Sequence, residues 1–342
     1  MRIGVLTGGG DCPGLNAVIR AIIRKGEAIH GHALVGYKYG WKGVIEGNST
    51  ELTIANSRGL LHRGGTMLGT SRMSPAMFED GAQQVQGTMT SDNVDALIAI
   101  GGEGTLSGAA AMSAAGINIV GVPKTIDNDI SATDVTFGFH TAVQIATDAI
   151  DRLHTTAESH DRVMVVEVMG RHAGWLAAYS GIAGGADVIL VPERPFDIEK
   201  VCDQIKRRHS RGVKFSIIVV AEGSTPVEGT MKKIEYEVDD YGHQRLGGIG
   251  YQVAREIETR THFETRETSL GHVLRGGTPT AFDRVLATRF GIAAVDAVHN
   301  QEYGTMVALH GTRVETVSLH DATNELKTVD EELMDVAAVF FG

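Results

Sequence analysis

Apolar runs without polar alternation recur along the chain, and most of them are followed by helical spacing. Three such runs, at residues 3–6, 94–100 and 117–122, each lead into a glycine-rich or acid-rich segment. Unbroken apolar runs of this length are typical of parallel strands that are covered on both faces. The same criterion predicts further strands at residues 33–39, 163–169, 187–191, 215–221, 306–309 and 314–319.

Helical periodicity separates these strands. It predicts helices at residues 16–25, 106–115, 142–153, 198–209 and 251–259. Asp197 has the position and the side chain of an N-cap, and residues 141–144 and 328–331 have the pattern of a capping box at a helix start. Alternating strands and helices favour an α/β fold.

Polar and flexible residues gather where three of the predicted strands end. Pro123 is expected to stop ladder pairing, which puts Lys124, Thr125, Asp127 and Asp129 in the following loop. Open α/β sheets hold their ligands beyond the carboxyl ends of their strands. Aspartate also favours turns for local reasons, so the three loops together, rather than this one alone, predict a ligand site.

The other two loops suit phosphate chemistry. Residues 7–14 supply glycines between a strand and a helix, where backbone N–H groups can approach an anion. This loop matches neither of the common phosphate-binding patterns, and a tight turn remains the alternative. In residues 101–105, Glu103 is a candidate Mg²⁺ ligand, because magnesium often uses one or two carboxylates with water and substrate phosphates; a solvent-facing glutamate is the alternative.

Arginines elsewhere in the chain are further candidates for anion contact. Residues 63–72 place glycines and hydroxyls between two arginines, although an exposed loop has the same composition. Arg171 follows the predicted strand 163–169, and residues 264–277 contain Arg266, His272 and Arg275. Charge-assisted hydrogen bonds from such groups bind doubly charged ligands well.

The length and the net charge of the chain narrow the class of protein. With 342 residues, two domains are expected. A formal net charge of −11 argues against broad binding of nucleic acid or of anionic membranes. Cys12 and Cys202 are too few for a disulfide framework, and no apolar run reaches the ~20 residues of a membrane span, so we expect a cytoplasmic protein. The 14 histidines show no recognised metal-binding spacing.

Five motifs occur in order over residues 1–320, at 8–16, 101–105, 123–129, 169–171 and 271–277. With them the chain resembles the 6-phosphofructokinase family, in the branch that contains ATP-dependent and pyrophosphate-dependent enzymes. The resemblance implies two Rossmann-like three-layer domains with mainly parallel sheets and an active site in the cleft between them. It implies a phosphate-donor domain of residues 1–138 and about 251–305. The expected sugar-phosphate domain is 139–250 with about 306–320, and 321–342 would be a helical extension.

The resemblance also implies roles for single residues. Asp127 would take the proton from the sugar 1-hydroxyl beside Thr125, while Arg171 and Lys124 would neutralise charge on the transferred phosphoryl group. ATP with Mg²⁺ at Glu103 would be held by Gly10, Arg72, Met73, Gly102, Glu103, Gly104 and Thr105. Many relatives have Asp at position 103, so coordination through water is open.

Fructose 6-phosphate is the implied acceptor. Its expected contacts are Thr125, Ile126, Asp127, Arg162, Met169, Gly170, Arg171, Glu222, Arg266, His272, Val273, Leu274 and Arg275. Arg162 and Arg266 would come from a neighbouring subunit, which implies a homo-oligomer, a dimer at minimum and a homotetramer by expectation. An effector nucleotide between subunits would meet Arg20, Arg24, Arg211 and Lys214, but His154 stands where such relatives commonly have Arg.

Two residues give opposite indications about the donor. Lys124 resembles the pyrophosphate-using enzymes, and Gly104 resembles the ATP-using ones. An acid at position 104 would crowd and repel the α-phosphate of ATP, so the glycine favours ATP. A pyrophosphate-dependent phosphotransferase and a non-catalytic sugar-phosphate or nucleotide sensor are the alternatives, and retention of Asp127, Thr125 and Arg171 argues against the sensor.

Overall fold

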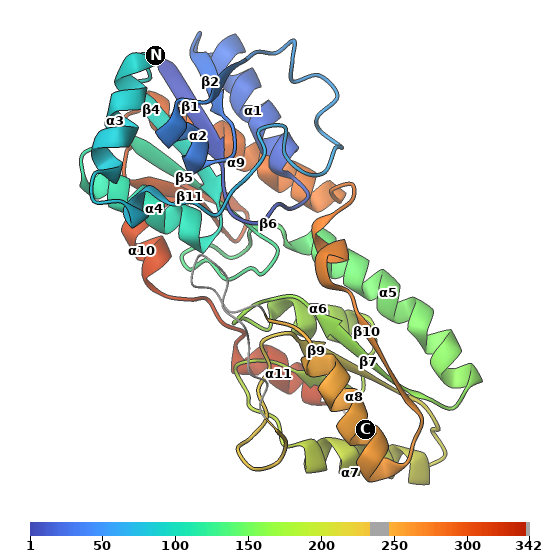
Figure 1. Ribbon diagram of the computed structural model, residues 1–342. Helices are drawn as coiled ribbons and strands as arrows, with labels where there is room; N and C mark the ends of the chain where they lie inside the picture. The colour runs from blue at the N-terminus through green and yellow to red at the C-terminus, as the bar shows by residue number, and fades with distance from the viewer. Residues whose placement is uncertain (233–245, 340–342) are drawn as a thin grey trace. The chain divides into compact units, whose positions relative to one another are not determined.

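The structure is a computed structural model that describes residues 1–232 and 246–339 (Figure 1). It divides into two compact units, each built from separate segments of the chain. The first unit contains Met1–Ile126, Ile130–Thr141 and Arg275–Leu326. The second contains Asp127–Asp129, Ala142–Leu274 and the residues from Lys327 onward.

The first unit is built on one sheet with the strand order β12-β11-β5-β4-β1-β2-β3, and β6 pairs with β5. The five central strands are parallel, whereas the edge strands β3 and β12 are antiparallel to their neighbours. The strands are β1 Arg2–Thr7, β2 Ala33–Tyr37, β3 Ser49–Leu52, β4 Ala96–Gly101, β5 Ile119–Thr125, β6 Phe137–Gly138, β11 Thr305–His310 and β12 Arg313–Ser318.

Helices cover both faces of this sheet (Figure 1). Residues of α2, α3, α4 and α10 share one buried cluster with the sheet, and Trp41 in it is 1% exposed. The helices α1 and α9 pack against each other, and Gly291 permits this, because a Cβ there would lie 2.7 Å from the Val18 carbonyl. The helices are α1 Leu15–Ala28, α2 Trp41–Glu46, η1 Pro75–Met77, α3 Gly81–Ser91, α4 Glu103–Ala114, α9 Ala281–His299 and α10 Leu319–Asn324.

The second unit is built on a smaller, wholly parallel sheet with the order β10-β7-β9-β8. The strands are β7 Val163–Val168, β8 Val188–Leu190, β9 Ser216–Ala221 and β10 Thr265–Ser269. The helices are α5 Phe139–Ser159, which starts in the first unit, α6 Trp175–Ala183, α7 Ile198–Ser210, α8 Ile249–Thr261, η2 Gly271–Arg275 and α11 Glu331–Ala338. Apolar residues of α7 and α8 form a core with the sheet. The predicted mixed α/β fold with mainly parallel sheets is thus confirmed.

The expected domain boundaries differ from the observed division. Residues 306–320 supply β11 and β12 to the first sheet, where β11 pairs with β5 at Thr305↔Val120. Residues 251–274 supply most of α8 and all of β10 to the second unit. The segment 321–342 is not one extension, because its residues up to Leu326 belong to the first unit and α11 belongs to the second. Long-range strand pairing, which has no local pattern, decides these assignments.

Two predicted features near Pro123 are also corrected. Strand β5 continues through Pro123 to Thr125, with Gly101 paired to Pro123 and Lys124 paired to Phe137 of β6. The proline is tolerated because β11 pairs with β5 only at Val120 and Gly121, so this end of β5 has no β11 partner. Lys124 and Thr125 therefore end the strand and only the aspartates follow it.

Helix starts were predicted with mixed success. The Asp197 side chain accepts a hydrogen bond from the Glu199 N–H at 3.0 Å, which confirms that N-cap. Thr141 does not cap a helix, because α5 begins at Phe139 and the Thr141 hydroxyl donates to Asp283. Asp330, not Thr328, caps α11.

Among the residues that the structure describes, none of the helices is both long and apolar enough to cross a membrane.

Candidate active site

Three loops leave the first sheet from neighbouring strands. Strands β1, β4 and β5 lie side by side in parallel, and their last residues are in register, with Thr7 beside Ile100 and Gly101 beside Pro123. The segments that begin at Gly8, Gly102 and Ile126 therefore emerge at the same edge of the sheet. The three segments from which the sequence predicts a ligand site therefore begin on neighbouring strands.

Close packing explains the glycines at this edge. The Gly8 N–H donates to the Ile100 carbonyl at 2.9 Å, and a Cβ on Gly8 would lie 2.5 Å from Thr105 Oγ1. A Cβ on Gly101 would lie 2.2 Å from the Thr105 Cβ. The glycine loop and the start of α4 are thus in contact through Thr105, which is 5% exposed.

Gly102, Glu103 and Gly104 form the amino-terminal end of α4 rather than a loop, which corrects the predicted helix start at residue 106. Gly102 is the N-cap and Glu103 lies in the first turn with an exposed side chain. The first N–H groups of a helix have no acceptor within it and carry partial positive charge, so this end favours an anion. A Cβ added at Gly104 would meet no atom within 4 Å, so the side of the helix there is open.

Two cations lie on the glycine loop. Lys124 is 2% exposed and its ammonium donates to the Gly10 carbonyl. Arg275 Nη1 donates to the Asp11 carbonyl at 3.4 Å, and a Cβ on Gly10 would lie 1.9 Å from that nitrogen. Arg275, expected among the sugar-phosphate contacts, is thus found on the glycine loop of the first unit.

The arginine-flanked segment 63–72 is also attached to this loop. The Gly9 N–H donates to the Ser71 carbonyl at 2.9 Å, next to the exposed Arg72 and the half-buried Met73. Asn16 Nδ2 donates to the Arg63 carbonyl at 3.1 Å, and the Asn16 Oδ1 accepts from the Met67 N–H at 2.8 Å. Asn16 holds the segment and was not among the predicted site residues, although it ends the first motif.

The acids after β5 are buried rather than solvated. Asp127 is 5% exposed and Asp129 is 8% exposed, and Ile126 before them is 1% exposed. The Thr125 carbonyl accepts from Thr136 Oγ1 at 2.8 Å, and the Asp129 carbonyl accepts from the Lys327 N–H at 3.0 Å. The backbone on either side of Asp127 is therefore fixed by hydrogen bonds.

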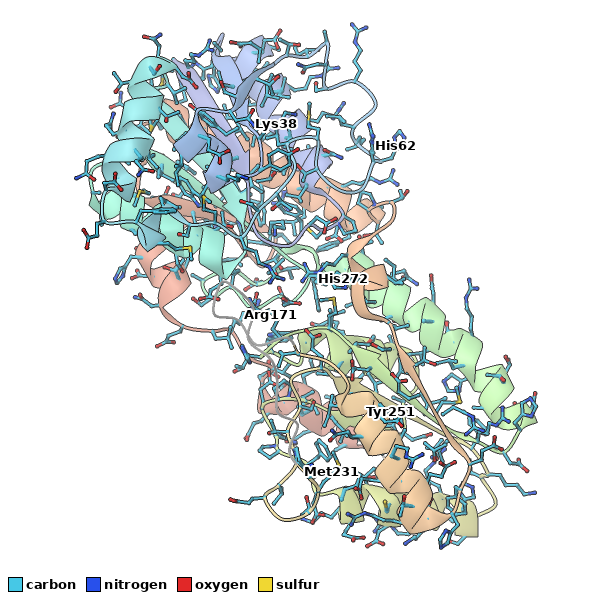
Figure 2. All side chains as sticks on the ribbon, in the orientation of Figure 1. Lys38, His62, Arg171, Met231, Tyr251 and His272 are labelled. Carbon is cyan, nitrogen blue, oxygen red and sulfur yellow. The ribbon has the colours of Figure 1, made fainter. Side chains whose placement is uncertain are left out.

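In the second unit, charged side chains occupy the carboxyl ends of β7 and β9. Val168 and Ala221 are paired, so the segments Met169–Arg171 and Glu222 that follow them start side by side (Figure 2 labels Arg171). The Arg171 N–H donates to Glu222 Oε1 at 3.2 Å. Of the expected sugar-phosphate contacts, the structure brings Met169, Gly170, Arg171 and Glu222 together here.

Arg171 has a strained backbone, with φ of 51° after Gly170 at 144°. A Cβ on Gly223 would lie 1.8 Å from the Arg171 carbonyl, so this glycine leaves room for the bend. Strain of about 1–3 kcal/mol persists only where surrounding structure enforces it, and it is concentrated at functional sites.

Arg162 and Arg266 lie at the other end of the same sheet. Arg162 precedes β7, and Arg266 of β10 is in register with Met164. Arg162 pairs with Glu264 at 2.7 Å and Arg266 pairs with it at 2.5 Å. Because a parallel strand rises ~3.3 Å per residue, the length of β7 puts about 20 Å between these arginines and Arg171. The structure does not bring them to the Arg171 end of their own subunit.

The segment with His272, Val273 and Leu274 forms the short helix η2 after β10. His272 (labelled in Figure 2) and Val273 are exposed, whereas Leu274 is fully buried. Leu274 anchors this turn and leaves its two neighbours accessible.

Burial makes both cysteines poor candidates for a catalytic nucleophile. Burial raises the pKa of Cys12 to about 12 and that of Cys202 to about 11. The thiolate is the reactive form, so both thiols are inert near neutral pH.

Comparison with known proteins decides the family. The family model described as Phosphofructokinase matches residues 2–298. The chain belongs to the phosphofructokinase family. It is 58% identical to a pyrophosphate–fructose 6-phosphate 1-phosphotransferase of Amycolatopsis methanolica and 55% identical to an ATP-dependent 6-phosphofructokinase of Mycobacterium leprae, with all of each chain covered. This phosphofructokinase also shares its fold with a crystal structure of the pyrophosphate-dependent phosphofructokinase from Nitrosospira multiformis, with a TM-score of 0.86 at 20% identity over 100% of this chain and 91% of the other.

Proposed function

We propose that this phosphofructokinase transfers the γ-phosphoryl group of ATP to the 1-hydroxyl of D-fructose 6-phosphate, giving fructose 1,6-bisphosphate and ADP. The activities of the relatives from A. methanolica and M. leprae support the sugar-phosphate acceptor. The observation that carries the proposal is that two glycine-rich segments and the segment with Asp127 leave neighbouring strands at one edge of the first sheet. Phosphoryl transfer requires positioning and charge neutralisation above all, and this edge supplies both.

Asp127 acts as the general base in this proposal. It removes the proton from the attacking hydroxyl, and the backbone hydrogen bonds around it keep its carboxylate in place. Arg171 stabilises the negative charge that develops on the transferred group, and Lys124 holds the Gly10 carbonyl and adds positive charge to the same loop. Thr125 orients the end of β5 through the hydrogen bond between its carbonyl and Thr136.

The residues present fit a magnesium ion. Glu103 has an exposed carboxylate in the first turn of α4, and Mg²⁺ commonly takes one or two carboxylates with water and substrate phosphates. Glu103 would hold the ion, directly or through water. When bound, the ion supplies neutralisation of charge on the donor phosphates.

The open side of α4 at Gly104 favours ATP over pyrophosphate. A carboxylate at this position would stand next to Glu103 and repel the α-phosphate of ATP, a group that pyrophosphate lacks. Lys124 does not oppose ATP, because its ammonium donates to the Gly10 carbonyl, a support for the loop that either donor can use. The alternative donor, pyrophosphate, is favoured by the 58% identity to the A. methanolica enzyme.

The proposal is tested by measuring kcat/KM for ATP and for pyrophosphate with fructose 6-phosphate and Mg²⁺. The native enzyme should prefer ATP. Gly104→Asp should lower ATP use and raise pyrophosphate use relative to it, and the substitution should be tolerated because a Cβ there has open space.

Gly104→Asn is the matched control, because it has the same size without the charge. If the preference between ATP and pyrophosphate changes in Gly104→Asp but not in Gly104→Asn, the carboxylate is the cause. A native preference for pyrophosphate would show the donor assignment to be wrong while leaving the sugar-phosphate site intact. If neither donor gave turnover, the proposal that this chain phosphorylates fructose 6-phosphate would be wrong.

We further propose that the active site is shared between subunits of a homotetramer in the cytoplasm. Arg162 and Arg266 stand about 20 Å from Arg171 along β7, by the rise of a parallel strand. They can therefore serve the sugar phosphate of an adjacent subunit but not that of their own. Their pairing with Glu264 keeps both guanidinium groups oriented together.

A further inference from the structure

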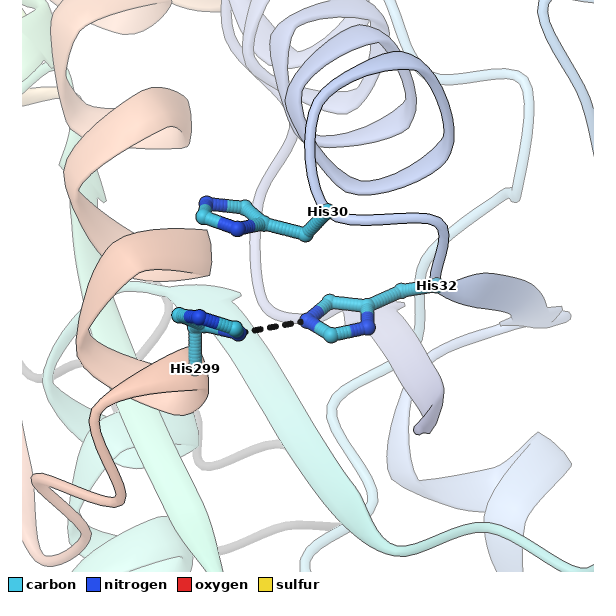
Figure 3. A group of neighbouring side chains, drawn as sticks. All are labelled: His30, His32 and His299. Atoms are coloured by element: carbon cyan, nitrogen blue, oxygen red, sulfur yellow. Dashed lines mark hydrogen bonds between the residues drawn. The ribbon is translucent and has the colours of Figure 1, made fainter.

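Three histidines from distant parts of the sequence meet in the first unit (Figure 3). His30 and His32 lie in the turn between α1 and β2, and His299 is the last residue of α9. His32 directly precedes β2, whose first residue pairs with the first residue of β1. The cluster therefore lies at the amino-terminal edge of the sheet, opposite the edge that carries the strand-end loops.

The ring nitrogens have a spacing that a metal ion requires. His32 Nε2 and His299 Nδ1 are 3.3 Å apart, and one nitrogen from each of the three rings lies within 4.8 Å of the others. In a tetrahedral site with metal–nitrogen bonds of 2.0–2.1 Å, ligand nitrogens stand about 3.3 Å from one another. The His32–His299 pair already has this spacing, and a nitrogen of His30 lies within 4.8 Å of both.

Asp296 orients His30 in the manner of a metal site. Its Oδ1 accepts a hydrogen bond from His30 Nε2 at 2.9 Å, which leaves Nδ1 for another partner. Metal-bound histidines usually donate their second N–H to a carboxylate, which fixes the ring and raises its basicity. Lys25 Nζ also pairs with Asp296 Oδ1 at 3.0 Å, which holds the carboxylate in place.

His32 is buried, His30 is half-buried and His299 is exposed, so one side of the cluster is open to solvent. A ligand set of three imidazoles with an open side suits zinc, cobalt or nickel rather than magnesium.

Simple packing of neutral rings is the competing explanation. The rings of His30 and His299 are stacked with centroids 4.0 Å apart, and such contacts occur without metal. A hydrogen bond between His32 Nε2 and His299 Nδ1 also accounts for their approach. Neither contact requires a third imidazole nitrogen within 4.8 Å of both, or a carboxylate bonded to that third ring. We propose that His30, His32 and His299 bind one divalent transition-metal ion, of the zinc and cobalt class, that ties the α1–β2 turn to the end of α9.

Cobalt titration of the chelator-treated, intact enzyme tests this site. One equivalent of Co²⁺ should give saturable ligand-field absorption bands, and Zn²⁺ should displace it and raise the melting temperature. His299→Gln should weaken Co²⁺ binding more than tenfold, because it removes a ligand. Asp296→Asn should weaken it about 10- to 100-fold, as expected for a residue that orients a ligand.

His320→Gln is the control, since its side chain is 77% exposed and it lies outside the cluster. It should bind Co²⁺ as the native enzyme does. If His299→Gln does not fold, His30→Gln provides the same comparison, with folding checked by circular dichroism. Equal Co²⁺ affinity in the native enzyme and in a folded cluster variant, or binding that does not saturate at one equivalent, would overturn the site. Turnover with Mg²⁺ should be unchanged throughout.

Discussion

In both units the candidate functional groups lie at the carboxyl ends of parallel strands, but the first unit uses backbone groups and the second uses charged side chains. In the first unit, glycines bring the backbone of β1, β4 and their loops close together, and the first N–H groups of α4 favour an anion. In the second unit, a strained arginine and a glutamate stand at the ends of β7 and β9. Backbone groups suit a donor of repeated phosphates, whereas long charged side chains suit a single sugar phosphate.

The largest effect is expected at the chain segment that follows β5. Asp127→Ser should lower kcat about 10²- to 10⁴-fold, the usual contribution of a positioned general base. Steady-state kinetics with ATP and fructose 6-phosphate would measure it. Asp127→Asn keeps the shape without the charge and should lose as much, while sugar-phosphate binding persists in both. Near-native turnover in either variant would contradict the assignment of Asp127 as the base.

Two substitutions at Arg171 separate the effect of its charge on kcat from the effect of its backbone strain on stability. Removing a group that stabilises transition-state charge should lower kcat about 10²- to 10³-fold in both Arg171→Gly and Arg171→Ala. Only glycine relieves the positive φ, so Arg171→Gly should be about 1 kcal/mol more stable than Arg171→Ala. Urea unfolding gives the stability difference. Equal stability of the two variants would show that the backbone at this position is not strained.

Mixed oligomers would test whether Arg162, at the end of β7 opposite Arg171, contributes to the active site of a neighbouring subunit. Arg162→Ala should weaken sugar-phosphate binding by about 2–5 kcal/mol, the usual result of removing one partner of a buried charge pair. Co-assembly of Arg162→Ala with Asp127→Ser should restore activity, because about half of the sites in a twofold-symmetric mixed pair are then complete. Lys200→Ala is a control for the loss of a surface cation, since Lys200 is exposed on α7 and belongs to none of the predicted sites. A verified mixed oligomer without activity would argue against shared sites.

A further effect is expected on stability at high pH, well above the pH at which the enzyme would be assayed, and each unit contains one cysteine that reports on it. Burial raises the pKa of Cys12 from 9.0 to about 12, so an unfolded chain releases this proton at a lower pH than the folded chain does. Between about pH 9 and pH 12 the unfolded state binds fewer protons, and stability therefore falls as pH rises. Below pH 9 the thiol makes no pH-dependent contribution.

Thiol labelling separates the two units. At pH 8, iodoacetamide should label Cys12 and Cys202 more than about a hundredfold more slowly than in the unfolded chain, because each must first be exposed by opening of its unit. Mass spectrometry of Cys202→Ala and Cys12→Ala variants would give each rate alone. Rapid labelling of one native thiol would identify that unit as the less stable.

The strands and the loops that follow them could be predicted from the sequence because their signals are local. Apolar runs and glycines identified the edge where β1, β4 and β5 end. The segment Thr265–Ser269 shows no apolar run, and β10 was not predicted, because its stability comes from pairing with β7 rather than from its own residues. The helix α9 was also not predicted, although it supplies His299.

Contacts across long sequence separations explain the remaining differences. Thr141 has the local pattern of a cap, but its hydroxyl donates to Asp283, and burial makes that pairing the stronger requirement. The placement of Arg275 on the glycine loop and the meeting of His299 with His32 also depend on the fold. The H-x-H spacing of His30 and His32 was the one available signal of that cluster.

The division of the chain into alternating segments affects its synthesis. Each unit is made of three segments, so the chain passes between units five times. Strand β5 is made long before its neighbour β11, and at 5–20 residues per second the delay is on the order of ten to forty seconds. During that time one edge of β5 lacks its final partner, which exposes the nascent chain to unwanted pairing. Neither unit can be obtained by cutting the gene at a single point, and a ribosome that stops before β11 releases a chain in which both halves are unfinished.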